Sequence, residues 1–76
     1  MAYDQSPIDR HVGYQIESRR KALQISRADL GHMLDLSEIE IAAWEAGRTR
    51  VSASKLFEVS RVLKVPVAYF FEAYIK

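Results

Sequence analysis

The sequence predicts an all-α fold, a compact domain of five short helices with a helix-turn-helix unit at its centre. Apolar residues recur every three to four positions over most of the chain, which is the period of an amphipathic helix. Serine, proline and glycine stand where such helices would begin and end. A chain of 76 residues supports one core, and no stretch alternates as a strand does. We therefore expect a flexible arm over residues 1–6 and one domain over 7–76.

The composition excludes several classes of protein. A hydrophobic share of 49% with 28% charged residues is typical of a globular domain, and no apolar run is long enough to cross a membrane. The absence of cysteine and of a secretion signal predicts a cytoplasmic protein, nucleoid-associated if it binds DNA. The chain has two histidines, no phosphate-binding loop and no cluster with metal-ligand spacing. We expect no enzyme activity and no cofactor, metal or small-molecule ligand.

The first helix is predicted from about Pro7 to Leu23. Ser6 can cap it, and proline is tolerated in a first turn. Its apolar stripe consists of Ile8, Val12, Ile16 and Leu23. We expect an outer basic cluster in its last turn, formed by Arg19, Arg20 and Lys21. Such a cluster complements the helix dipole, and we favour that structural role over contact with phosphate.

Residues 26–47, SRADLGHMLDLSEIEIAAWEAG, predict two short helices around a tight turn. Ser26 and Ser37 can cap the two helices, and Gly47 suits the left-handed conformation that ends the second. Gly31 in helix 27–34 indicates that another backbone packs closely there. The side chains expected to face inward from this helix are Leu30, Met33 and Leu34.

The second helix of the unit is predicted over residues 37–46. Ser37 and Glu40 fit an S-x-x-E capping box. Ile41 and Trp44 should face the core. The side chains expected on the outer face are Glu38, Ile39, Glu40 and Ala43.

After a basic loop over residues 47–52, Ser52 caps a helix predicted over 53–64. Its apolar face consists of Leu56, Val59, Val62 and Leu63. Pro66 ends that helix, because the residue before proline avoids the helical region, and a fifth helix is predicted over about 66–75. That helix carries more apolar surface than one small core needs. We expect one of Phe70 and Phe71 to close the core, and a homodimer interface formed by Phe71, Tyr74 and Ile75.

Charge is distributed unevenly along the chain. The net charge of +1 argues weakly against a nucleic-acid partner, since DNA-binding domains usually carry a basic excess. Residues 36–47 nevertheless carry a local charge of −3, and residues 48–64 carry +4. The basic excess therefore follows the second helix of the unit instead of lying on it.

Four segments carry a resemblance to a known family: IESRRKAL, SRADLGHML, LSEIEIAAWEAGR and SASKLFEVSRVLKVPVAYFFE. Through them, residues 12–72 resemble a DNA-binding domain of the Cro and phage-repressor type, the xenobiotic-response-element (XRE) family of helix-turn-helix regulators. The resemblance implies a lambda-repressor-like fold. It also implies a transcriptional regulator, usually a repressor, that binds operator DNA as a homodimer with helix 37–46 in the major groove.

The family pattern assigns roles to particular positions. Base reading falls on Glu38, Ile39 and Ala43. Phosphate contact is expected from Arg27, Ser37, Arg48, Arg50 and Lys55. Arg27 stands where the family usually has glutamine, and it could also pair with Glu38.

The reading positions depart from the family, whose members usually offer Gln, Ser, Thr, Arg or Asn there. A glutamate can accept from the cytosine amino group, and Ile39 or Ala43 can pack on a thymine methyl. We therefore expect affinity to come from the basic residues beside the helix, with modest or shape-based specificity. The alternative is a protein-binding module whose acidic helix 37–46 meets a partner regulator, a toxin or RNA polymerase.

Overall fold

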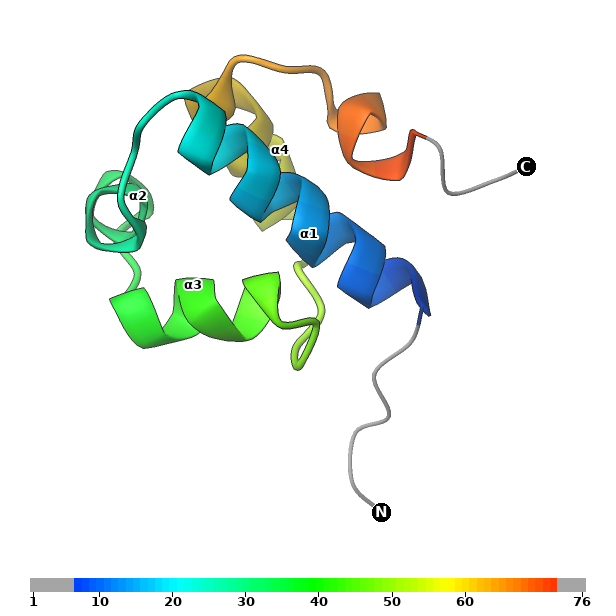
Figure 1. Cartoon of the computed structure of the whole chain (residues 1–76), viewed down its shortest axis with the longest axis horizontal. Helices are drawn as coiled ribbons and strands as arrows, with labels where there is room; N and C mark the ends of the chain where they lie inside the picture. Colours follow the sequence, from blue (N-terminus) through cyan, green and yellow to red (C-terminus); the bar gives the residue numbers. More distant parts are fainter. Residues whose placement is uncertain (1–6, 73–76) are drawn as a thin grey trace.

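The computed structural model describes residues 7–72, and this part of the chain is all-helical, as predicted. It contains four α-helices and one short 3-10 helix: α1 Pro7–Ala22, α2 Arg27–Leu34, α3 Glu38–Glu45, α4 Ala53–Leu63 and η1 Val67–Phe71. In Figure 1, α1 runs through the middle of the molecule, with α2 and α3 on one side of it and η1 on the other. The helix α1 contacts α3, α4 and η1, so it is the element around which the others pack.

The count of five helices is not confirmed, because the fifth element is a single stretch of 3-10 helix. Glu72 already has an extended backbone, with φ −63° and ψ 144°. Side chains of α1 take carbonyls that a longer α-helix would use: Gln15 Nε2 donates to the Tyr69 carbonyl at 3.3 Å, and His11 Nε2 lies 2.8 Å from that of Glu72. The predicted arm over 1–6, the Ser6 cap, and Tyr74 and Ile75 lie outside the described residues.

One apolar cluster joins all five elements. Its buried members are Val12, Ile16, Leu30, Leu34, Ile41, Trp44, Leu56, Val59, Leu63 and Phe70. Phe70 has no exposed surface, so it is the phenylalanine that closes the core. Met33 was predicted to face inward, and that prediction was wrong: its side chain is 53% exposed. Leu30 and Leu34 already fill the inward face of α2, and Met33 lines a shallow pocket beside Val62 of α4.

Serine residues start the helices as predicted. The hydroxyls of Ser26, Ser37 and Ser52 accept from the backbone N–H three residues on. The helix ends were harder to foresee. Each α-helix ends at a left-handed residue, and these residues are Gln24, Asp35, Gly47 and Lys64. The next N–H then bonds back to a carbonyl five residues earlier, at distances of 2.7–3.0 Å. Only one of the four is glycine, so the left-handed conformation was predicted at that end alone.

Two glycines allow backbones to touch. A Cβ on Gly31 would lie 2.6 Å from the Leu36 carbonyl oxygen, which confirms the close approach predicted in α2. A Cβ on Gly13 would overlap the Trp44 carbonyl oxygen. The backbones of α1 and α3 therefore cross in direct contact, and this crossing fixes how α3 is presented.

Candidate nucleic-acid interface

The N-terminus of α3 is held by the predicted capping box. Ser37 Oγ accepts from the Glu40 N–H at 3.1 Å, and Glu40 Oε1 accepts from the Ser37 N–H at 2.9 Å. The Ser37 hydroxyl also donates to Glu40 Oε1 at 3.2 Å. Glu40 is thereby turned back toward its own helix start, so its carboxylate is not aimed outward along the helix.

The outer face of α3 is led by two exposed side chains, Glu38 and Ile39. Ile39 is 81% exposed, the highest value among the exposed large hydrophobic residues of the described chain. Ala43 is only half-buried, one helical turn further along. Ile41 and Trp44 face the core, as predicted. Most of the apolar surface of Ile39 is therefore available for contact with a partner.

The other end of α3 is anchored by a buried ion-pair network that the sequence did not reveal. Glu45 Oε2 accepts from Arg20 Nε at 2.7 Å, and Glu45 Oε1 accepts from Arg20 Nη2 at 3.1 Å. Arg20 Nη1 also donates to the Ile25 carbonyl at 2.9 Å. Arg20 is only 6% exposed, so the prediction that it lies on an outer basic face was wrong.

The sequence does carry a signal for the burial of Arg20, although none for its partner. Arg20 continues the four-residue spacing of Val12 and Ile16 and thus lies on the buried stripe of α1. Its neighbours Arg19 and Lys21 serve structure too. Arg19 Nε donates to the Leu63 carbonyl at 2.9 Å, and Lys21 pairs with a glutamate of its own helix at 3.1 Å. All three side chains thus have partners within the domain, which agrees with the structural role favoured for the cluster.

Arg27 joins the same network from the start of α2. Its Nε donates to Glu45 Oε1 at 2.8 Å, and its Nη2 lies 3.7 Å from Glu17 Oε2. The hydrogen bond to Glu45 raises the pKa of Arg27 above its ordinary value, with a smaller Coulombic contribution from Glu38. The alternative pairing with Glu38 is not formed. With 40% of its side chain exposed, Arg27 braces the end of α3 while keeping part of its guanidinium at the surface.

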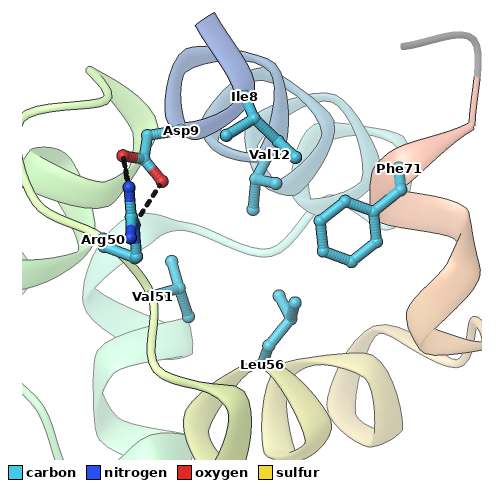
Figure 2. A pocket seen from close by; sticks show the side chains of 7 residues that line it. All are labelled: Ile8, Asp9, Val12, Arg50, Val51, Leu56 and Phe71. Carbon is cyan, nitrogen blue, oxygen red and sulfur yellow. Dashed lines mark hydrogen bonds and ion pairs between the residues drawn. The ribbon is translucent and has the colours of Figure 1, made fainter. Parts of the chain in front are cut away.

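The basic loop after α3 is tied down at both ends. At its start, Gly47 has φ +72°, and the Arg48 N–H bonds the Ala43 carbonyl at 2.9 Å. Arg48 is exposed and has no carboxylate partner within residues 7–72. Further on, Arg50 Nε lies 3.2 Å from Oδ1 of the buried Asp9, which ties the loop to the first turn of α1 (Figure 2).

The remaining predicted residues lie at the edges of this surface. Lys55 sits in the first turn of α4, with its Nζ 3.5 Å from Glu58 Oε1. Phe71 lies on the far side of an open pocket of about 290 Å³, opposite the pair of Asp9 and Arg50 (Figure 2). The pocket is otherwise apolar, lined by Ile8, Val12, Val51 and Leu56. The dimer residues Tyr74 and Ile75 are beyond the described range.

These contacts rank the five predicted phosphate ligands. Arg27, Arg50 and Lys55 each have a carboxylate partner, and Ser37 is occupied as a cap. Arg48, in contrast, has no carboxylate partner within residues 7–72. No group of three or more His, Cys, Asp or Glu residues in the described part of the chain could hold a metal ion, and no helix there is long and apolar enough to cross a membrane.

The sequence profile of the helix-turn-helix family matches residues 16–70. The chain belongs to this family. Its resemblance to the Cro and phage-repressor (XRE) type is confirmed by relatives. An uncharacterized HTH-type transcriptional regulator of Sinorhizobium medicae is 45% identical over 67 residues, covering 88% of this chain and 48% of the relative. Repressor protein C2 of Salmonella phage P22 is 34% identical over 58 residues, covering 76% of this chain and 27% of that protein. The chain spans about half the length of the regulators it matches.

Solved structures agree on the fold. The P22 c2 repressor in complex with a synthetic operator superposes with a TM-score of 0.74 at 33% identity, covering 80% of this chain and 92% of that one. Hydroxypropylphosphonic acid epoxidase from S. wedmorenis superposes with a TM-score of 0.77 at 21% identity, covering 82% of this chain and 33% of the enzyme. The second likeness shows the fold alone, and no enzyme activity follows from it.

Proposed function

We propose that this chain is the DNA-binding part of a transcriptional repressor that binds operator DNA as a homodimer, in the cytoplasm at the nucleoid. The observation that carries the proposal is the exposed face of α3, which is anchored at both ends and led by Ile39 at 81% exposure. A rigid helix with an unpacked outer side is what reading in the major groove requires. P22 c2 repressor, a relative whose fold this chain shares, is described in complex with a synthetic operator.

Base reading is assigned to Glu38, Ile39 and Ala43. Ile39 packs on a thymine methyl, and Glu38 accepts from a cytosine amino group. Ala43, which is only half-buried, leaves room for a base edge at the middle of the helix. Because none of the three makes a bidentate contact with a purine, specificity is modest and depends in part on DNA shape.

Phosphate contact is assigned to Arg27, Ser37, Arg48, Arg50 and Lys55, and Arg48 contributes most. Its charge has no carboxylate partner within residues 7–72, whereas the charges of Arg27, Arg50 and Lys55 are partly neutralised by Glu45, Asp9 and Glu58. Dimer contact is assigned to Phe71, Tyr74 and Ile75. A two-fold dimer places two α3 helices about 34 Å apart, one turn of duplex.

The test is selection from a random duplex pool by the purified chain at low salt, followed by titration of the enriched duplex. Counterion release makes the logarithm of the association constant fall linearly with the logarithm of salt, with a slope of about −0.9 for each phosphate neutralised. The proposal predicts enrichment of one duplex family and a steep slope. If no duplex is enriched at low salt, the proposal fails.

A protein-binding module is the second candidate, because the exposed start of α3 carries Glu38 with no basic residue on the helix itself. Such a face would meet a basic surface on a partner regulator, an antitoxin-type complex or RNA polymerase. The variant Glu38→Lys separates the two functions. It strengthens phosphate attraction, so affinity for duplexes of unrelated sequence rises while the cytosine contact is lost, whereas it abolishes binding to a basic protein surface.

A further inference from the structure

The open pocket beside η1 is an apolar cavity with one charged end. Its volume is about 290 Å³, close to the lower limit of about 300 Å³ that is typical of small-molecule sites. Its apolar walls come from α1, the loop after α3, α4 and η1, and consist of Ile8, Val12, Val51, Leu56 and Phe71. The ion pair of Asp9 and Arg50 forms the end opposite Phe71 (Figure 2). Because the lining residues come from four separate segments, no motif in the sequence predicts this pocket.

At the charged end the cation is accessible and the anion is covered. The Asp9 side chain is 6% exposed, and its oxygens accept from Arg50 Nε at 3.2 Å and from Arg50 Nη2 at 3.3 Å. The Arg50 side chain is 67% exposed. A guanidinium has more N–H donors than one carboxylate can use, so a second carboxylate can share the group. A ligand ammonium would first have to displace Arg50 from Asp9. The charge of the pocket therefore complements an anion.

We propose that this pocket binds a small apolar carboxylate. The hydrocarbon part lies against the apolar walls, and the carboxylate accepts from the Arg50 guanidinium. The site is additional to the proposed function, because α3 needs no ligand to contact DNA. Its regulatory effect does rest on that function, which assigns Arg50 to a phosphate contact. The dimer contact assigned to Phe71 is kept, with the partner subunit on the side of the ring away from the pocket.

Ligand binding should weaken DNA binding, because Arg50 belongs to both sites. Arg50 lies in the loop between α3 and α4, two residues after Arg48. Without ligand, Asp9 balances the charge of Arg50. With ligand, two carboxylates surround one guanidinium, so the cluster carries a net negative charge beside the DNA backbone. A phosphate is then repelled where it was attracted, and one phosphate contact is lost.

Isothermal titration calorimetry of the full chain with three amphiphiles of equal tail length tests the pocket. The probes are octanoate, octanol and octylammonium, which differ only in the head group. Octanoate should bind about tenfold more tightly than octanol, because its carboxylate gains hydrogen bonds to a charged group, and octylammonium should bind most weakly. The inference is overturned if octanoate shows no binding at millimolar concentration, or if octanol binds equally well.

Two charge variants locate the head group. Arg50→Gln and Arg48→Gln each remove one positive charge from the same loop, but Arg50 lines the pocket and Arg48 does not. Arg50→Gln should weaken octanoate binding about tenfold, whereas Arg48→Gln should change it less than about twofold. Octanol binding should stay within about twofold in both variants, which verifies that the pocket is intact. Equal losses of octanoate affinity would indicate attraction by the overall charge of the loop and would overturn the contact with Arg50.

Two size variants locate the hydrocarbon part. Val51→Phe adds bulk to the wall of the pocket, whereas Val62→Phe makes the same change at a half-buried position that does not line it. The melting temperature of each variant verifies that the fold is intact. Octanoate binding should be lost in Val51→Phe alone. Equal binding by the two variants contradicts the assignment to this pocket.

DNA titration separates this inference from the proposed function. Calorimetry needs no DNA, so failure of the wild-type chain to bind any duplex overturns the proposed function alone. With saturating octanoate, affinity for the enriched duplex should fall, and the salt slope should become shallower by about 0.9 for one lost phosphate contact. An unchanged slope overturns the regulatory effect. Sedimentation with octanoate is the control for Phe71: if octanoate acts by dissociating the dimer, and does so equally in Arg50→Gln, the role given to Arg50 is overturned.

Discussion

Removing the buried carboxylate of Glu45 should destabilise the domain more than any other single ion-pair change. Its two oxygens accept three hydrogen bonds from Arg20 and Arg27 at 2.7, 3.1 and 2.8 Å. In Glu45→Leu, the guanidinium of Arg20 stays buried without a counter-charge. Breaking a buried pair by removing one partner costs about 3–5 kcal/mol. A chain of 76 residues has a total free energy of unfolding of about 4–11 kcal/mol, so this variant loses a large part of it.

Urea denaturation of the full chain measures the effect. With a slope of about 1 kcal/mol per molar urea for so small a domain, the midpoint should fall by about 3 M or more. Glu17→Leu is the matched control. Glu17 pairs with Lys21 and Arg27 at a partly exposed site, where an ion pair contributes about 1 kcal/mol or less.

The double variant Arg20→Met with Glu45→Leu tests the physical reason. Replacing both members of a buried pair by apolar residues is often neutral or stabilising, because no buried charge remains. The double variant should therefore unfold within about 1 kcal/mol of the wild-type chain. Arg27, at 40% exposure, remains solvated in both variants. Equal destabilisation of the single and double variants would refute the role given to Arg20.

Four further variants test separate parts of the account. Gly13→Ala should lower the free energy of unfolding by about 2 kcal/mol or more in urea denaturation, because the added Cβ overlaps the Trp44 carbonyl oxygen of α3. An unchanged urea midpoint would contradict the direct contact between the backbones of α1 and α3. Lys64→Gly should raise the free energy of unfolding by about 1 kcal/mol, because glycine adopts the left-handed conformation without strain, whereas Gly47→Ala should lower it by at least as much. If both variants shift the stability in the same direction, left-handed strain does not explain the effects. Arg48→Ala should reduce the salt slope of DNA binding by about 0.9, and an unchanged slope would remove Arg48 from the phosphate contacts.

Charge reversal tests phosphate contact more clearly at Arg48 than at Arg50. Arg50 holds the buried Asp9, so Arg50→Glu would place two carboxylates together and disturb the first turn of α1. A loss of DNA binding in that variant would not distinguish contact from misfolding. Arg48→Glu is the cleaner reversal, because Arg48 has no carboxylate partner within residues 7–72.

Local signals in the sequence predicted the helix starts and the family. A serine cap acts within three residues, so Ser26, Ser37 and Ser52 could be identified without knowing the fold. The backbone approach at Gly31 was also predictable, since a missing side chain in a helix has few other uses. The outward position of Ile39 follows from helical period alone.

Contacts between distant positions could not be predicted in the same way. Arg20 and Glu45 are 25 residues apart, and nothing in either segment identifies the other as its partner. Met33 has the helical spacing of an inward residue, but it stays 53% exposed while Leu30 and Leu34 are buried on the same helix. The short length of η1 depends on side chains of α1 that take its carbonyls. These are tertiary effects. Ion pairs, two of them of the same long-range kind, leave Arg48 as the predicted phosphate-contacting cation without a carboxylate partner within residues 7–72.

The most direct test of the central claim is a comparison of Ile39→Ala with wild type on the duplex selected by the wild-type chain, with each thymine replaced in turn by uracil. Uracil lacks the methyl group that Ile39 is proposed to contact. Wild type should lose affinity at one or two thymines, by about 1 kcal/mol each, and Ile39→Ala should be indifferent to the same replacements. If the two proteins respond alike at every thymine, α3 does not read the DNA through its exposed face.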